Sequence, residues 1–176
     1  MQVILDMVIS LNGMVAREDG QEDWLPFEGW TDFIEESKKY DNIIMGRETY
    51  DKVTEFYQDH NFDDVPVSEK IIVTRSADFK APVGYTIVHS PHEAVSYLEA
   101  KGFKSLYLIG GGVLNAEFIK HALVTDIHLT VTPYILGKGR PFLAQSDIEA
   151  RLTLKDSKIL SNGRIRLLYS VNEQGE

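Results

Sequence analysis

The feature that most constrains the fold is an alternation of strand-length apolar runs with segments of helical pattern. The apolar runs cover residues 3–9, 42–45, 70–74, 85–88, 105–109 and 126–131. Helical patterns lie between them at residues 31–40, 48–57, 91–100 and 115–122. Because strands that alternate with helices build parallel sheets, this order predicts an α/β fold.

The pattern changes after about residue 124, where the helical segments stop. Residues 152–160 and 164–171 alternate in strand fashion around Ser161-Asn162-Gly163. Asn-Gly between two such runs is the strongest short hairpin signal. A chain of 176 residues suits one domain. We therefore expect a single domain over residues 1–176, with a mostly parallel central sheet, flanking helices and an antiparallel C-terminal hairpin.

Composition excludes several classes of function. The 18 basic and 27 acidic residues give a net charge of −9, which repels nucleic acid, so no such partner is expected. The absence of cysteine excludes disulfides, thiolate metal sites and cysteine nucleophiles. The histidines show no metal-ligand spacing, so no metal is expected. No segment approaches about 20 apolar residues, which favours a cytoplasmic protein without a membrane partner.

Two strands run directly into glycines at the start of a helix. Residues 108–115 read Leu-Ile-Gly-Gly-Gly-Val-Leu-Asn, and residues 43–50 place Arg47 and Thr49 just after Gly46. Glycines let a backbone approach a phosphate, and a helix N-terminus offers unpaired N–H groups with a partial positive charge. From spacing alone, each pattern also fits a tight strand-to-helix turn, or an arginine in a surface ion pair.

A third strand ends at Thr74-Arg75-Ser76. In open parallel sheets, ligands bind beyond the carboxyl ends of the strands. Three such ends together predict a phosphate-bearing cofactor. A Rossmann fingerprint would need a glycine where Asn115 stands, and a Walker A loop would need Gly-Lys-Ser/Thr, which is absent. The sequence therefore predicts a nucleotide phosphate site of another kind.

Several charged and aromatic residues carry weaker signals. Asp6 interrupts a buried strand, where a charge is costly unless it is paired or used, or else it lies at a strand end in water. Lys138 and Arg140 lie in a glycine-rich loop that fits either an anionic substrate or solvent. The acidic pairs at residues 22–23 and 35–36 are expected on solvated faces. Three aromatic residues are expected in the core: Trp24, Phe27 and Trp30.

In order and spacing, these residues resemble the dihydrofolate reductase-like fold family. The chain is most similar to the reductase domain of bifunctional riboflavin-biosynthesis enzymes and its stand-alone relatives. Residues 10–16 look like the family's S-x-D-G-x-I-A, with Asn12 in place of Asp, and residues 45–50 resemble the M-G-R-x-T-[WY] of dihydrofolate reductases. The riboflavin-type C-terminal half resembles residues 110–118, Thr125-Asp126 and 133–139.

The resemblance implies an enzyme that uses NADPH to transfer hydride to a small heterocyclic, aminopyrimidine-like or pterin-like substrate. The expected activity is similar to that of dihydrofolate reductases or of 5-amino-6-(5-phosphoribosylamino)uracil reductases. It implies that the cofactor phosphates are held by Gly46, Arg47 and Thr49, and the 2′-phosphate end by Thr74, Arg75 and Ser76. It further implies a pyrophosphate cradle from Gly110, Gly111, Gly112, Val113, Leu114 and Asn115. The nicotinamide end would be lined by Val8, Val15 and Ala16, and the catalytic residues facing the substrate would be Asp6 and Thr130.

The chain also departs from its relatives. Dihydrofolate reductases carry a carboxylate on the helix before M-G-R, where an ungapped count places Trp30, and Asp32 is expected to point elsewhere. Riboflavin-type enzymes usually also carry a zinc deaminase domain. This sequence is too short to include one and has no cysteine to bind its zinc. Lys138 and Arg140 are the only suggestive basic pair for a ribose-phosphate substrate. The alternative function is a non-catalytic NADP(H)-binding sensor module. Since riboflavin-type relatives often pair through their sheets, a homodimer is also implied.

Overall fold

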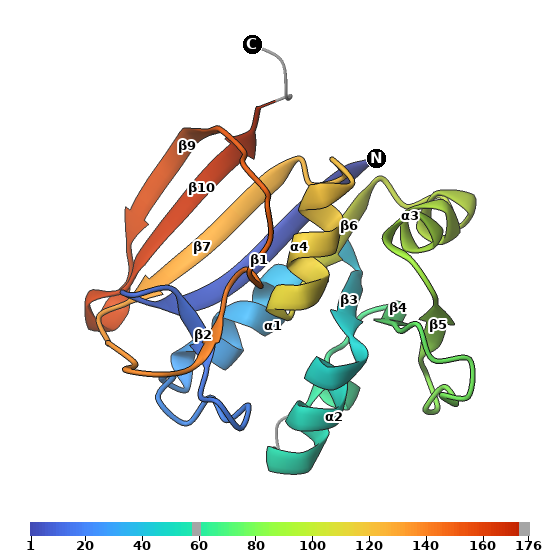
Figure 1. Ribbon diagram of the computed structural model, residues 1–176, viewed down its shortest axis with the longest axis horizontal. Helices are drawn as coiled ribbons and strands as arrows, with labels where there is room; N and C mark the ends of the chain where they lie inside the picture. The colour runs from blue at the N-terminus through green and yellow to red at the C-terminus, as the bar shows by residue number, and fades with distance from the viewer. Residues whose placement is uncertain (58–60, 173–176) are drawn as a thin grey trace.

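An eight-stranded sheet forms the centre of the molecule (Figure 1). The computed structural model describes residues 1–57 and 61–172. The strands of this sheet are β1 (Gln2–Ser10), β3 (Asn42–Gly46), β4 (Glu69–Val73), β5 (Thr86–Val88), β6 (Ser105–Leu108), β7 (Asp126–Thr132), β9 (Leu152–Ile159) and β10 (Ile165–Val171). Their order across the sheet is β5-β4-β3-β6-β1-β7-β10-β9.

The sheet is mixed in the way the sequence predicts. β1 runs parallel to β6 and β7, and β3 runs parallel to β4 and β6. β5 is parallel to β4, whereas β10 is antiparallel to both β7 and β9. The expected parallel sheet with an antiparallel C-terminal hairpin is therefore confirmed.

The hairpin turn depends on its Asn-Gly dipeptide. Asn162 and Gly163 have φ values of 60° and 72°, in the left-handed region that favours these two residue types. The turn, a short 3₁₀ segment over Ser161–Gly163, is closed by the Leu160 amide, which donates to the Arg164 carbonyl at 2.8 Å. This turn fixes the register of β10 and hence the face on which Arg166 lies.

In the part of the chain that the structure describes, four helices cover the sheet: α1 (Glu28–Tyr40), α2 (Arg47–Phe56), α3 (Pro91–Ala100) and α4 (Gly112–Lys120). The start of α3 is confirmed, because the Ser90 side chain accepts from the Glu93 amide. The expected starts of α1 and α4 were three residues late. In α4 this is because Gly111 is extended and acts as the N-cap, so the helix begins at the next residue. Within the described residues, none of these helices has both the length and the apolar character to cross a membrane.

Two apolar clusters lie on opposite faces of the sheet. One packs α3 and α4 against alternate strand residues such as Leu5 and Leu108. The other packs α1 and α2 against the intervening residues, such as Ile4 and Ile43. Figure 1 shows α4 in front of the sheet and α1 behind it. The α1 face continues over β7 and β10, and the candidate site lies there.

A small second sheet was not predicted. It pairs β2 (Met14–Ala16) with β8 (Arg140–Pro141), and these strands are antiparallel. The Asn12 amide holds the neighbouring loops together, since its Nδ2 donates to the Leu136 carbonyl and its Oδ1 accepts from the Leu136 amide at 3.1 Å. The remaining short element is a 3₁₀ turn, η1, over Phe62–Asp64.

Candidate active site

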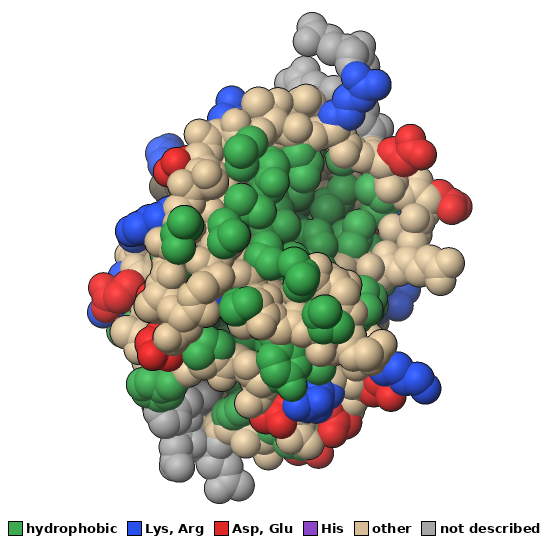
Figure 2. Space-filling model, turned by 90° about the vertical axis from the view of Figure 1, so that its left-hand side faces the viewer, with side chains coloured by type: hydrophobic (Ala, Val, Ile, Leu, Met, Phe, Trp, Pro, Cys, Tyr) green, Lys and Arg blue, Asp and Glu red, His purple; other side chains and the backbone are tan. Residues whose placement is uncertain are grey.

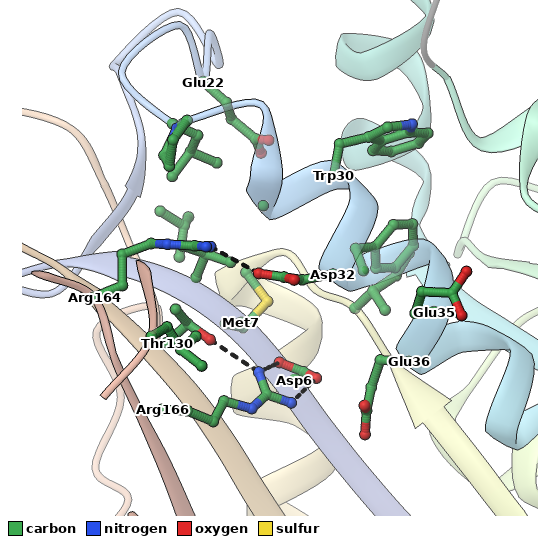
Figure 3. Close-up of a pocket in the computed structure, with 18 of the residues that line it drawn as sticks. Asp6, Met7, Glu22, Trp30, Asp32, Glu35, Glu36, Thr130, Arg164 and Arg166 are labelled. Atoms are coloured by element: carbon green, nitrogen blue, oxygen red, sulfur yellow. Dashed lines mark hydrogen bonds and ion pairs between the residues drawn. The ribbon is translucent and has the colours of Figure 1, made fainter. Parts of the chain in front are cut away.

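A cavity of about 620 Å³ lies between α1, the segment before it, β1, β7 and the C-terminal hairpin (Figure 3). Its size suits a small heterocyclic ligand. Apolar and charged side chains share its lining, and most of the charged ones are paired. The side chains that line it come from segments far apart in the sequence.

The floor is a hydrogen-bonded cluster around Asp6, whose residue is only 9% exposed. Arg166 donates from both Nη atoms to the two carboxylate oxygens, and the Tyr107 hydroxyl donates to Oδ2 at 2.7 Å. Arg166 Nη1 also donates to Thr130 Oγ1 at 3.0 Å. Asp6 and Thr130, the two predicted catalytic residues, therefore lie together in the cavity, joined by an arginine that the sequence analysis did not identify.

Electrostatics fix the charges of this cluster. Burial disfavours the charge of Arg166, but the Asp6 carboxylate outweighs burial and raises the pKa of the guanidinium. Burial, followed by the nearby Asp6 charge, raises the pKa of Tyr107 well above its ordinary value, so the phenol stays protonated and donates. The Asp6 oxygens are thus occupied by donors, which suits holding a substrate in place better than giving it a proton.

A second ion pair forms the wall. Arg164 is 2% exposed, and its Nη1 lies 3.0 Å from Asp32 Oδ2. The other guanidinium nitrogens donate to the carbonyl and hydroxyl of Ser161. The expectation that Asp32 points elsewhere was wrong: it lines the cavity, as does Trp30 two residues earlier in α1. Figure 3 shows Asp32 and Arg164 facing each other across it.

The basic side chains of the cavity are not the predicted ones. Arg140 pairs with Glu48 at 2.6 Å and, like the exposed Lys138, does not line the cavity. Of the two alternatives expected for this loop, an anionic substrate or solvent, the structure places its charged side chains outside the cavity lining. The basic residues that line it are Lys39, Lys158, Arg164 and Arg166.

Glu22 contradicts the expectation of a solvated acidic pair. The Arg17 amide donates to the Gln21 carbonyl at 2.8 Å, so the chain turns back just before this residue. The Glu22 amide donates to the Tyr57 hydroxyl at 2.7 Å, and the carboxyl group points into the cavity (Figure 3). The residue is half-buried, and the burial of its carboxyl group raises the pKa to about 7. Asp23, in contrast, is exposed, as expected.

The aromatic residues divide between core and cavity. Trp24 is buried as expected and stacks on Tyr134, with ring centroids 5.6 Å apart. Phe27, expected in the core, is 65% exposed and lines the cavity with Trp30 and Phe33. A planar ring can pack against these side chains.

The two strand ends that carry the predicted glycines, at Gly46 and at Gly110–Gly111, meet beside the cavity. The Gly46 amide donates to the Gly110 carbonyl at 2.8 Å, and a Cβ on Gly111 would lie 3.0 Å from Thr49 Oγ1. Gly46 and Gly111 are the N-caps of α2 and α4, and neither helix has a side chain bonded to its first amides. Two helix N-termini with uncapped N–H groups therefore converge next to Thr49, which also lines the cavity.

The third predicted strand end, at residues 74–76, lies next to the end of β3, because Gly46 of β3 pairs with Val73 of β4. Just beyond, Thr74 is buried and its Oγ1 accepts from the Ser76 amide at 3.2 Å, while Arg75 is exposed. Arg47 packs over the ring of Phe79, and its Nε lies 3.2 Å from Asp51 Oδ2.

The other predicted cofactor residues differ in accessibility. Val8 and Val15 line the cavity, whereas Ala16 is buried beside it and does not. Val113 is exposed, and Leu114 is buried against Gly46. Asn115 is fully buried; its Nδ2 donates to the Phe142 carbonyl, while its Oδ1 has no hydrogen-bond partner within the described residues.

The residues that the sequence analysis missed are Arg164, Arg166, Tyr107 and Glu22. A signal for the arginines was present: in the hairpin, basic residues alternate with apolar ones, and Arg166 pairs in register with Thr130. The face of the hairpin that meets the cavity depends on the register of β10 against β7, and the sequence alone does not give this register. Tyr107 lies within an apolar strand and carries no such signal.

These features define the class of protein: an α/β chain of the dihydrofolate reductase-like fold, with a cavity beside the carboxyl ends of its parallel strands. More narrowly, the chain belongs to the RibD C-terminal domain family, whose model matches residues 1–165. The family and the structural neighbours are of the RibD reductase type, which points to an oxidoreductase.

Individual relatives agree with this placement. In an alignment 184 residues long, the chain is 27% identical to the uncharacterised protein YyaP of Bacillus subtilis (strain 168). The alignment covers 97% of this chain and 95% of YyaP. It superposes with a TM-score of 0.81 and 26% identity on a protein from Shewanella sp. PV-4 described as a candidate riboflavin biosynthesis protein, covering 98% and 100% of the two chains. Dihydrofolate reductase from Enterococcus faecalis, in a complex with NADP(H), shares the fold at a TM-score of 0.70 and 16% identity, covering 98% of this chain and 97% of that enzyme.

Proposed function

We propose that the protein is an NADPH-dependent reductase that transfers hydride to a small heterocyclic substrate of the aminopyrimidine or pterin kind. The observation that carries this proposal is the meeting of three glycine- and arginine-bearing strand ends beside a cavity that holds paired charges. The strand ends suit a dinucleotide, and the cavity suits a planar polar ring. The RibD C-terminal family supports the riboflavin-type reaction among the alternatives.

The residues at the strand ends fit a dinucleotide with two phosphates. The uncapped amides of α2 and α4 offer donors to the phosphate oxygens. A side chain at Gly111 would crowd Thr49, so glycine keeps this approach open. Arg75, exposed at the end of β4, suits an additional phosphate on the adenosine ribose, which favours NADPH over NADH.

The residues at the floor would hold and orient the substrate. When bound, NADPH supplies the hydride, and the protein supplies position and electrostatics. The Asp6–Arg166–Thr130 cluster presents a fixed set of donors and acceptors, while Trp30 and Phe33 pack against a planar ring. Lys158, exposed at the rim, suits a negatively charged substituent such as a phosphate.

The test is NADPH oxidation, followed by loss of absorbance, with 5-amino-6-(5-phosphoribosylamino)uracil and with 7,8-dihydrofolate. We expect turnover with the pyrimidine and little with dihydrofolate. Turnover of dihydrofolate alone would assign the substrate to the pterin kind, and NADPH oxidation with neither compound would contradict the proposed activity.

The alternative, a non-catalytic NADP(H)-binding sensor, rested on the missing carboxylate in α1. Three carboxyl groups of α1, those of Asp32, Glu35 and Glu36, are among the groups that line the cavity, so that argument no longer favours it. NADPH binding without turnover of any heterocycle would restore the sensor.

We also propose that the protein forms a homodimer through β9 and β10. Figure 2 shows apolar side chains gathered in a hollow on the side of the molecule that carries these strands. Ile159 pairs in register with Ile165, and both are exposed, as are Leu152 and Leu154. Apolar surface of this kind marks an interaction site. Light scattering after gel filtration should give twice the 19.9 kDa chain mass, and Ile159→Glu should give the monomer.

A further inference from the structure

Among the residues that the structure describes, one carboxyl group of the cavity has no ion-pair partner. Five carboxylic side chains line the cavity, and each of the others forms an ion pair: Asp6 with Arg166, Asp32 with Arg164, Glu35 with Lys38 and Glu36 with Lys39. Glu22 forms no ion pair within the described residues. An ion pair therefore does not explain the position of this carboxyl group in the cavity.

Backbone hydrogen bonds hold the Glu22 segment in place. Its amide is fixed by the Tyr57 hydroxyl at the end of α2, and the turn at Arg17–Gln21 returns the chain alongside β2. β2 carries Val15, which lines the same cavity and is predicted to lie at the nicotinamide end. The cavity lining also includes the apolar side chains of Leu25, Pro26 and Val53.

We infer that Glu22 is the general acid that gives a proton to the substrate as it is reduced. This inference rests on the proposed function. In the step, a hydride and its electron pair pass from the dihydronicotinamide to the carbon of a C=N or C=O bond, which breaks the π bond. The nitrogen or oxygen takes the proton from the Glu22 carboxyl group, leaving a carboxylate that solvent reprotonates. The substrate is reduced and the nicotinamide is oxidised.

The other acidic groups in the cavity are less suited to this step. Both oxygens of Asp6 accept hydrogen bonds from Arg166, and Asp32 is paired with Arg164. The Tyr107 hydroxyl donates to Asp6, so it is not directed at a ligand. A donor must be protonated at neutral pH, and burial gives Glu22 that property by raising its pKa to about 7.

The charged and titratable groups around Glu22 leave this property intact. On its own segment, Arg17 pairs with Asp23, and Asp19 bonds to Gln21. From α2, Tyr57 has a pKa raised chiefly by burial, and Lys52 pairs with Glu55. Across the cavity, Asp32 of α1 and Arg164 neutralise each other. Burial is therefore the cause of the raised pKa of Glu22.

The experiment compares E22Q with the wild type and with E18Q. Glu18 is an exposed glutamate of the same segment that does not line the cavity, so E18Q is a matched control. The first readout needs no substrate: infrared difference spectroscopy follows the carboxyl band of the NADPH-saturated protein from pH 5 to 9. The second is the pH profile of single-turnover NADPH oxidation with 5-amino-6-(5-phosphoribosylamino)uracil.

We expect a protonated-carboxyl band that disappears with a midpoint near pH 7 in the wild type and E18Q, and that E22Q lacks. The wild-type rate should fall above about pH 7, and E22Q should lose this limb and about 100-fold or more in rate while retaining NADPH affinity. A titration near the ordinary glutamate value would overturn the inference, as would a wild-type rate in E22Q. Failure of the wild type to bind NADPH would instead refute the proposed function, and the inference with it.

Discussion

The raised pKa of Glu22 makes a prediction about stability that needs no ligand. In the unfolded chain this carboxyl group titrates near its ordinary value of 4.5, and in the folded chain it titrates near 7. Between these pH values the folded state binds a proton that the unfolded state has lost. The free energy of unfolding therefore falls as the pH rises from about 4.5 to 7, and the loss is complete above pH 7.

The magnitude follows from the two pKa values. Each pH unit between them corresponds to about 1.4 kcal/mol, so the ionised Glu22 side chain costs the folded state about 3 kcal/mol at pH 8. Glu22→Gln keeps the shape and removes the titration. The stability of this variant relative to the wild type should rise by about 3 kcal/mol between pH 4 and pH 8, or roughly 6–12 °C in Tm for a chain of this length.

The assay is urea unfolding followed by tryptophan fluorescence at a series of pH values. All other titrating groups are shared by the two proteins and cancel in the difference. Glu18→Gln, at an exposed position of the same segment, should show a difference that does not change with pH. If the Glu22→Gln difference were the same at pH 5 and pH 8, Glu22 would be an ordinary solvated carboxylate, and its place in the cavity would not raise its pKa.

Three further substitutions test the site and its supports. Arg166→Ala should destabilise the fold by about 3–5 kcal/mol in urea unfolding, because it leaves the buried Asp6 carboxylate without its counter-charge; loss of less than 1 kcal/mol would argue against the pair. Gly112→Ala should destabilise by about 1–3 kcal/mol, since its Cβ would lie 2.4 Å from the Pro141 carbonyl oxygen; a neutral effect would mean that the two segments separate easily. Arg75→Ala should weaken NADPH binding roughly tenfold or more in calorimetry and leave NADH binding unchanged; equal losses for both would remove the 2′-phosphate assignment.

Local sequence patterns predicted the fold well because its main elements obey local rules. The Ser90-Pro91 cap starts α3, and Asn162-Gly163 turns the hairpin. Strand-length apolar runs became the parallel strands. The glycine-rich ends could be grouped because parallel strands place their carboxyl ends at one edge of a sheet.

The cavity could not be predicted in the same way, since its charges are paired across the chain. Arg166 and Asp6 are 160 residues apart, and their contact depends on the register of β10 against β7. Glu22 points into the cavity, whereas its neighbour Asp23 is exposed. A backbone turn and a hydrogen bond to one tyrosine hydroxyl place Glu22 there. Such tertiary contacts decide whether a carboxyl group faces water or a cavity, and no local pattern encodes them.

The measurement that bears most directly on the proposed function is isothermal titration of the protein with NADPH and with NADH. The three strand ends at Gly46, Arg75 and Gly111 predict that NADPH binds at one site per chain, and more tightly than NADH. Absence of heat with both nucleotides, together with no rise in Tm in their presence, would contradict the assignment of these strand ends to a dinucleotide.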